Sequence, residues 1–175
     1  MLVDMGFLMR WQQPEPDRDP ALWTELSARL HALARSLTRS EADAADLTQQ
    51  AFAQVLATRP ERATHVGYLR QTLMRVWISR QRSMRREAAR WLRIARQSAL
   101  AVLPVDRVSD AEAVDRVRTQ IDLLPPMQRA VLALRLIEEL EYEQIATTLG
   151  ISVESARSTL HAARLKVRLA AGETE

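Results

Sequence analysis

The sequence predicts an all-α protein of two small helical domains joined by a flexible linker. Only four glycines and seven prolines occur in 175 residues, and the helix-favouring Ala, Leu, Arg, Gln and Glu are abundant. Apolar residues recur at steps of three and four in several stretches, which is the period of an amphipathic helix. Residues 97–108 lose this period around Pro104 and divide the chain. We therefore expect domains at 20–96 and 109–171, with a flexible N-terminal extension at 1–19.

The first two predicted helices have clear start signals. An acid at the N-cap and proline in the first turn place one start at Asp19 and Pro20. The apolar face of this helix contains Leu22, Trp23, Leu26, Leu30, Leu33 and Leu37. Ser40 and Asp43 resemble a capping box, with Asp in place of the usual Glu, and open a second helix that runs to about Ala57. A loop follows, because the helical period breaks after that residue.

The third predicted helix runs from Tyr68 to at least Met84 and has a period that can continue through Leu92. Residues 75–96 contain eight arginines and a single acid, Glu87. Guanidinium groups match the geometry of phosphate oxygens, so this block suggests contact with nucleic acid. The alternative is an arginine-rich composition that serves only solubility.

The C-terminal domain is predicted to contain four helices. Ser109 and Glu112 resemble a capping box that opens the first of them. The two prolines at 125–126 end this helix and start the next, which runs to about Ile137. Two further helices follow, on either side of Gly150.

The last two helices fit a helix-turn-helix, in which a short helix, a tight turn and a second helix present one face to a DNA groove. Gly150 can adopt the left-handed conformation that ends the first helix, and Ser152 can cap the second. The predicted apolar face contains Val153, Ala156, Leu160, Ala163 and Val167. The opposite face contains Glu154, Ser155, Ser158, His161, Ala162 and Leu165, flanked by Arg157, Arg164 and Arg168 on one side and Lys166 on the other. The flanking cations are placed for phosphates, although the pattern also fits an ordinary helical hairpin with a solvated basic face.

Composition excludes several function classes. The chain has no cysteine and only three histidines, which excludes disulfides, cysteine-ligated zinc and thiol catalysis and fits a cytoplasmic protein. No apolar run approaches the ~20 residues that span a membrane. The opening MLVDMGFLMR has no basic segment before its apolar residues, so we do not interpret it as a signal peptide. No metal cluster, glycine-rich phosphate loop or catalytic constellation is evident.

Residues 124–168 closely resemble the C-terminal promoter-binding region of extracytoplasmic-function (ECF) sigma factors of the sigma-70 family. This stretch is LPPMQRAVLALRLIEELEYEQIATTLGISVESARSTLHAARLKVR. Family members typically have L-P-x-x-x-R-x-V-L-x-L-R, then Y-x-E-I-A-x-x-L-G-I-S. The stretch SEADAADLTQQAFAQVL, residues 40–56, resembles their D-A-E-D-L-x-Q-E-x-F-x-x-x-W helix. The two motifs have the family's order and separation, and the resemblance extends from about Leu22 to Arg168.

The resemblance implies a non-enzymatic protein that needs no cofactor or metal. It would bind core RNA polymerase and the −10 and −35 elements of promoter DNA, directing promoter recognition, melting and transcription initiation. An anti-sigma factor is a further implied partner. Domain 20–96 corresponds to sigma region 2, and domain 109–171 to sigma region 4.

Specific residues are implied by their positions in the family's motifs. The implied polymerase-binding residues are Asp43, Asp46, Gln49 and Gln50. The implied contacts to the −10 element are Arg75, Ser79, Arg82 and Arg86. The implied contacts to the −35 element are Glu154, Ser155, Arg157, Ser158, His161, Arg164 and Lys166. A helical projection of residues 41–57 independently places the polymerase-binding set outward and Ala44, Leu47, Ala51 and Val55 inward.

The sequence departs from the family pattern in each functional segment. Ala45 and Gln50 stand where the family prefers acids, which should weaken attraction to a basic partner, and Thr159 and Ala162 replace frequent arginines. Glu139 and Glu141 replace the usual Gly and Ser, and each change could cost about 1 kcal/mol in helix capping. The stretch LMRVWISR lacks the common A-R-N pattern of the −10 helix. Within it, Met74 and Ile78 are expected to point outward and to need cover by the linker or a partner, and Trp77 is expected in the core.

Two other function classes compete with a sigma factor. One is a response-regulator-like helix-turn-helix regulator that does not bind core polymerase. Such a regulator needs neither the polar ridge of residues 43–50 nor the arginine-rich third helix. The other is an enzyme that acts on nucleic acid, which the absence of a recognisable catalytic constellation disfavours.

Overall fold

The computed structural model describes residues 19–38, 40–95 and 111–171 and is all-α over these ranges, as the sequence predicts. The helices are α2 (Pro20–Leu37), α3 (Glu41–Thr58), α4 (Val66–Ala95), α5 (Ala111–Leu123), α6 (Pro126–Leu136), α7 (Tyr142–Leu149) and α8 (Val153–Ala171). A short 3-10 helix, η1 (Pro60–Arg62), lies between α3 and α4. No helix in the described ranges is long and apolar enough to cross a lipid bilayer.

The predicted helix starts are confirmed in α2 and α3. The Asp19 side chain accepts a hydrogen bond from the backbone N–H of Ala21 at 2.9 Å. The Ser40 hydroxyl accepts from the N–H of Asp43 at 3.0 Å and donates to the Asp43 carboxylate at 2.6 Å. The Ser109 capping box, the linker at 97–108 and residues 1–18 of the extension lie outside the described ranges.

Helices α2, α3 and α4 form an N-terminal bundle. Its core includes Leu33, Leu47 and Leu73, all completely buried. Trp77 is 2% exposed, and its indole N–H donates to the carbonyl of Leu37 at 3.1 Å. The expectation that this tryptophan belongs to the core is therefore confirmed.

Helices α5 to α8 form a C-terminal bundle in which α8 packs against α5, α6 and α7. The L-P-x-x-x-R motif has a structural role here. The guanidinium of Arg129, at the start of α6, pairs with the Asp122 carboxylate at 2.6 Å, and both side chains are largely buried. The prolines separate α5 from α6 as expected, with Pro126 in the first turn of α6.

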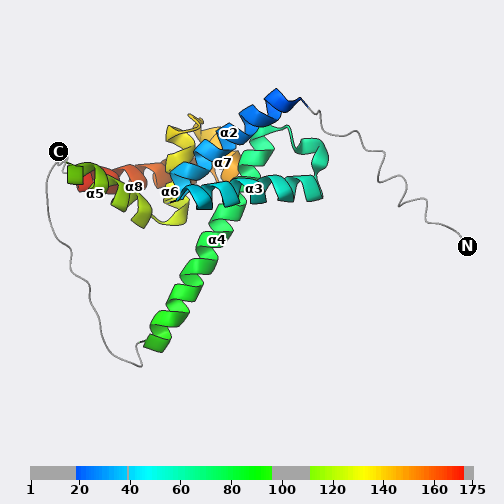
Figure 1. Ribbon diagram of the computed structural model, residues 1–175. Helices are drawn as coiled ribbons and strands as arrows, with labels where there is room; N and C mark the ends of the chain where they lie inside the picture. The colour runs from blue at the N-terminus through cyan, green and yellow to red at the C-terminus, as the bar shows by residue number, and fades with distance from the viewer. Residues whose placement is uncertain (1–18, 39, 96–110, 172–175) are drawn as a thin grey trace, which may run out of the picture.

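The two bundles pack against each other. Helix α4 contacts α6 and α7, and α2 also contacts α6, so that the buried apolar residues of both bundles form one connected cluster. Helix α4 is longer than its predicted minimum, and its C-terminal half extends beyond the other helices (Figure 1). One side of α4 packs against α2 and α3, and another side packs against α6 and α7.

Candidate partner and nucleic-acid interfaces

The polar ridge predicted on α3 lies on the surface. Asp43, Asp46, Gln49 and Gln50 are all exposed. On the opposite side, Ala44, Leu47, Ala51 and Val55 are completely buried against the bundle. The ridge thus combines two carboxylates and two amides on a rigid helix, which suits a partner with basic and hydrogen-bonding groups.

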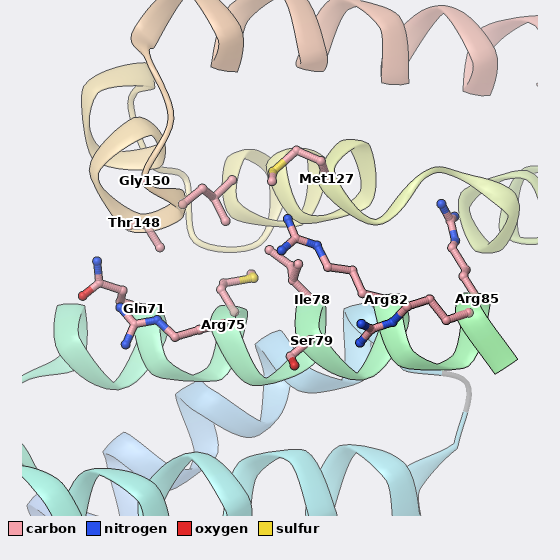
Figure 2. Close-up of a pocket in the computed structure, with 12 residues that line it drawn as sticks. Gln71, Arg75, Ile78, Ser79, Arg82, Arg85, Met127, Thr148 and Gly150 are labelled. Atoms are coloured by element: carbon pink, nitrogen blue, oxygen red, sulfur yellow. The ribbon is translucent and has the colours of Figure 1, made fainter.

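The arginine stripe predicted on α4 lines a cleft. Arg75, Ser79, Arg82 and Arg86 are exposed along one side of the helix. This cleft, of about 700 Å³, lies between α4 on one side and α6 and α7 on the other, and includes Met127 and Gly150 (Figure 2). Figure 2 shows the Arg82 side chain pointing from α4 toward Met127. Within the described ranges no acidic side chain lines the cleft, so its electrostatics favour an anion such as a phosphate backbone.

Met74 and Ile78 are covered, and the cover is the chain's own C-terminal bundle. Met74 is 1% exposed, and Ile78 is partly buried and packs against the core cluster. Both line the cleft together with Met127 and Leu149, and Ile78 points toward Met127 (Figure 2). The sequence predicted the need for cover and led us to expect it from the linker or a partner, whereas in the structure α6 and α7 supply it.

Helices α7 and α8 have the geometry of a helix-turn-helix. Gly150 has a φ of 66°, the left-handed conformation predicted for the end of α7. The Ser152 hydroxyl accepts from the N–H of Ser155 at 3.1 Å and so caps α8 as predicted. Ala156, Leu160 and Ala163 are buried, which orients α8 in its bundle. The short turn therefore fixes one face of α8 outward.

The predicted −35 residues lie on that outward side of α8. Glu154, Arg157, Ser158, His161, Arg164 and Lys166 are exposed, and Ser155 is partly buried. The Lys166 ammonium donates to the Gln128 side chain at 3.1 Å, which ties it to α6. The face between the cations therefore consists of short polar side chains, an acid and a histidine. Only close approach to a groove would let these groups contact base edges.

One neighbour of Arg157 was not predicted from the sequence. Its guanidinium lies over the Tyr142 ring, 5.3 Å from the centroid, and Arg135 lies 5.7 Å from the same centroid. Tyr142 therefore helps to position Arg157 at the edge of α8. The aromatic residue at the start of α7 was visible in the sequence, but its proximity to α8 depends on the turn between the helices.

Glu139 and Glu141, which depart from the family pattern, behave differently. Within the described ranges, Glu139 is the one non-glycine residue with a positive φ, at 53°. It therefore adopts the strained left-handed conformation, at a position where the family has glycine. At the start of α7, the N–H of Glu141 donates to the Gln144 side chain at 2.9 Å. The Glu141 carboxylate also pairs with Arg135 at 2.8 Å, a hydrogen bond that raises the pKa of Arg135. These contacts offset the expected loss of a serine cap.

Family models match both bundles. Residues 22–87 match the sigma-70 region 2 model, and residues 115–167 match the sigma-70 region 4 model. The chain is 30% identical to the ECF RNA polymerase sigma factor SigE of Mycolicibacterium smegmatis over 154 residues, 83% of this chain and 60% of that one. It is 33% identical to the RNA polymerase sigma-E factor of Streptomyces coelicolor over 140 residues, 77% of this chain and 75% of that one.

A solved structure shares the fold. The sigma factor RpoE of Bartonella quintana, in co-crystals with the anti-sigma factor NepR, superposes with a TM-score of 0.61 at 19% sequence identity. The match covers 87% of this chain and 95% of the RpoE chain. This likeness extends to helices of both bundles.

Proposed function

The chain belongs to the ECF sigma factors of the sigma-70 family, and we propose that it binds core RNA polymerase and directs promoter recognition, melting and transcription initiation. The observation that carries this proposal is the presence of three distinct surfaces on one chain. These are the polar ridge on α3, the arginine stripe on α4 and the outward face of α8.

We assign polymerase binding to the ridge of Asp43, Asp46, Gln49 and Gln50. The burial of small residues beneath it fixes the helix, so its polar groups are held in place before binding. Because only two of the four are charged, the docking energy depends on hydrogen bonds as well as on ionic attraction. Its affinity should therefore fall less steeply with salt than that of a fully acidic helix.

We assign the unwound −10 strand to the stripe of Arg75, Ser79, Arg82 and Arg86. Guanidinium groups spaced along a helix can follow successive phosphates, and the exposed hydroxyl can donate a further hydrogen bond. The nearby tryptophan, Trp77, is buried and bonded to Leu37, so it is not available as a stacking platform in this arrangement. Helix α4 would therefore bind the unwound DNA strand mainly through contacts to its phosphate backbone.

We assign the −35 duplex to α8. Arg157, Arg164 and Lys166 would contact phosphates and set the register of the helix in the groove. Glu154, Ser155, Ser158 and His161 would face base edges. With Thr159 and Ala162 in place of the family's arginines, fewer cations are available there, so we expect a modest −35 affinity and an altered sequence preference.

A regulator that uses the helix-turn-helix alone is less well supported. Such a protein would not need the exposed ridge on α3 or the acid-free arginine cleft beside α4. The proposed activity also requires no catalytic group in this chain, because the polymerase performs the chemistry. Its partners would then be core RNA polymerase, promoter DNA and, as for the RpoE relative, an anti-sigma factor.

Binding to core polymerase tests the proposal. In a pull-down with purified core enzyme, the wild-type chain should be retained and Asp46→Arg should not. Glu25→Arg is the matched control, since it reverses an exposed acid on α2, away from the ridge, and should bind like wild type. Equal retention of wild type and Asp46→Arg would refute the assignment of the ridge, and no retention of wild type would refute polymerase binding itself.

A further inference from the structure

The contact between the two bundles contains a buried ion pair. Arg70 on α4 donates from Nε to a carboxylate oxygen of Glu138 at 2.9 Å, and its Nη2 lies 2.7 Å from the same oxygen. The two side chains are only 10% and 4% exposed. Arg29 on α2 approaches the same carboxylate at 3.4 Å from a more exposed position. One acid of the C-terminal bundle is thus held by two helices of the N-terminal bundle.

Two further hydrogen bonds across this junction are longer. The Gln71 side chain donates to the carbonyl of Thr147 at 3.3 Å, and Arg85 donates to the carbonyl of Leu124 at 3.4 Å. Apolar side chains also pack across the junction, because the buried residues of both bundles form one connected cluster that includes Met74. Because a buried charge that loses its partner is costly, the pair is the polar contact most sensitive to substitution at this junction.

This packing is incompatible with simultaneous contact to both promoter elements. Positions −10 and −35 are separated by about 25 base pairs, or about 85 Å of duplex at ~3.4 Å per base pair. A compact body of ~140 residues is roughly 40 Å across. On the proposed function, α4 would bind one element and α8 the other, so the two bundles must move apart. The packed arrangement is then a closed state.

We infer that this chain holds itself closed through a latch formed by Arg70 and Glu138, and that the latch must open for promoter binding. Closure covers Met74 and makes the arginine stripe on α4 one wall of the cleft, with α6 and α7 as the other wall. The arginines of the cleft, Arg75, Arg82, Arg85 and Arg86, all lie on α4, and the facing residues from α6 and α7 carry no acid that would neutralise them. The inhibitory consequence rests on the proposed function, whereas the latch itself can be tested on the protein alone.

Distance measurements on the free, full-length chain test the latch. The chain has no cysteine, so spin labels can be placed on Ala57→Cys in α3 and Leu169→Cys in α8, both exposed and outside the proposed binding residues. We expect one narrow distance distribution for the otherwise wild-type chain, because the packed bundles fix the two labels relative to each other. Glu138→Gln and Arg70→Gln should each add a broad population at other distances, raising the open-to-closed ratio by roughly tenfold or more.

The controls separate the pair from general damage. Glu139→Gln changes an exposed acid in the same loop and should leave the distance unchanged. Combining Arg70→Gln with Glu138→Gln should raise the ratio by less than the product of the single effects, because both changes remove the same interaction. Far-UV circular dichroism should show unchanged helix content in every variant. A broad wild-type distribution, unchanged distances in both single variants, or fully independent effects would overturn the latch.

A binding assay then tests the consequence. If closure keeps the two DNA-binding surfaces too close together for a promoter, Glu138→Gln should bind a labelled promoter fragment with an unpaired −10 segment roughly tenfold more tightly than wild type, in the presence of core polymerase. If Glu138→Gln populates the open state but binds the promoter fragment no more tightly than wild type, inhibition by closure is refuted, although the proposal of the latch itself is not. No promoter binding by wild type or Glu138→Gln would refute the proposed function instead, since the distances are measured without polymerase or DNA.

Discussion

Replacement of Glu139 by glycine should stabilise the protein. Glu139 has a φ of 53° and is exposed, so its side chain contributes little packing while its backbone occupies the left-handed region. A non-glycine residue there costs about 1–2 kcal/mol. Glycine removes this cost but increases the freedom of the unfolded chain, which offsets about 0.4–1 kcal/mol. The net expected gain in free energy of unfolding is about 0.5–1 kcal/mol.

Thermal unfolding followed by circular dichroism at 222 nm measures this change. For a chain of this size, a gain of about 1 kcal/mol raises Tm by roughly 2–4 °C. Glu139→Ala is the matched control, because it removes the same carboxylate but keeps a Cβ in the left-handed region. It should show no gain. If the glycine variant is no more stable than the alanine variant, the backbone at this position is not strained, and the reasoning is wrong.

Three further substitutions test other parts of the structure. Arg157→Ala should weaken duplex binding to a similar extent across sequences and reduce the slope of log affinity against log salt concentration by about one. Fluorescence anisotropy at several salt concentrations measures both effects. A loss of affinity confined to one base position would show direct base contact instead. Asp122→Ala should lower the free energy of unfolding by roughly 3 kcal/mol in urea, because it removes a carboxylate from the buried Arg129 guanidinium, and a loss below about 1 kcal/mol would contradict this. Ser40→Ala should cost about 1 kcal/mol in the same assay by removing the α3 cap, whereas Ser27→Ala, an exposed site within α2, should cost much less.

Features that depend on neighbouring residues in the chain could be predicted from the sequence. The caps at Asp19, Ser40 and Ser152 follow from short-range hydrogen bonds, and each is present in the structure. The buried side of α3 follows from its helical period. The left-handed Gly150 likewise follows from the need to turn sharply between two helices.

Features that depend on how the bundles pack could not be predicted. Arg70 and Glu138 are 68 residues apart, and neither lies in a pattern that links it to the other. Arg70 counts as one more cation on a basic helix until α6 and α7 are placed beside it. Met74 shows an intermediate case, because its outward position in the period revealed the need for cover, and only the tertiary arrangement identified the C-terminal bundle as that cover.

Reconstituted transcription tests the central claim most directly. Core RNA polymerase, with and without this protein, would be incubated with a library of genomic promoter fragments and nucleotides, and run-off transcripts would be sequenced. We predict discrete transcripts that depend on the protein, start at a small set of sites, and disappear with Asp46→Arg but persist with Glu25→Arg. Transcripts that are the same with and without the protein would contradict its role as a sigma factor.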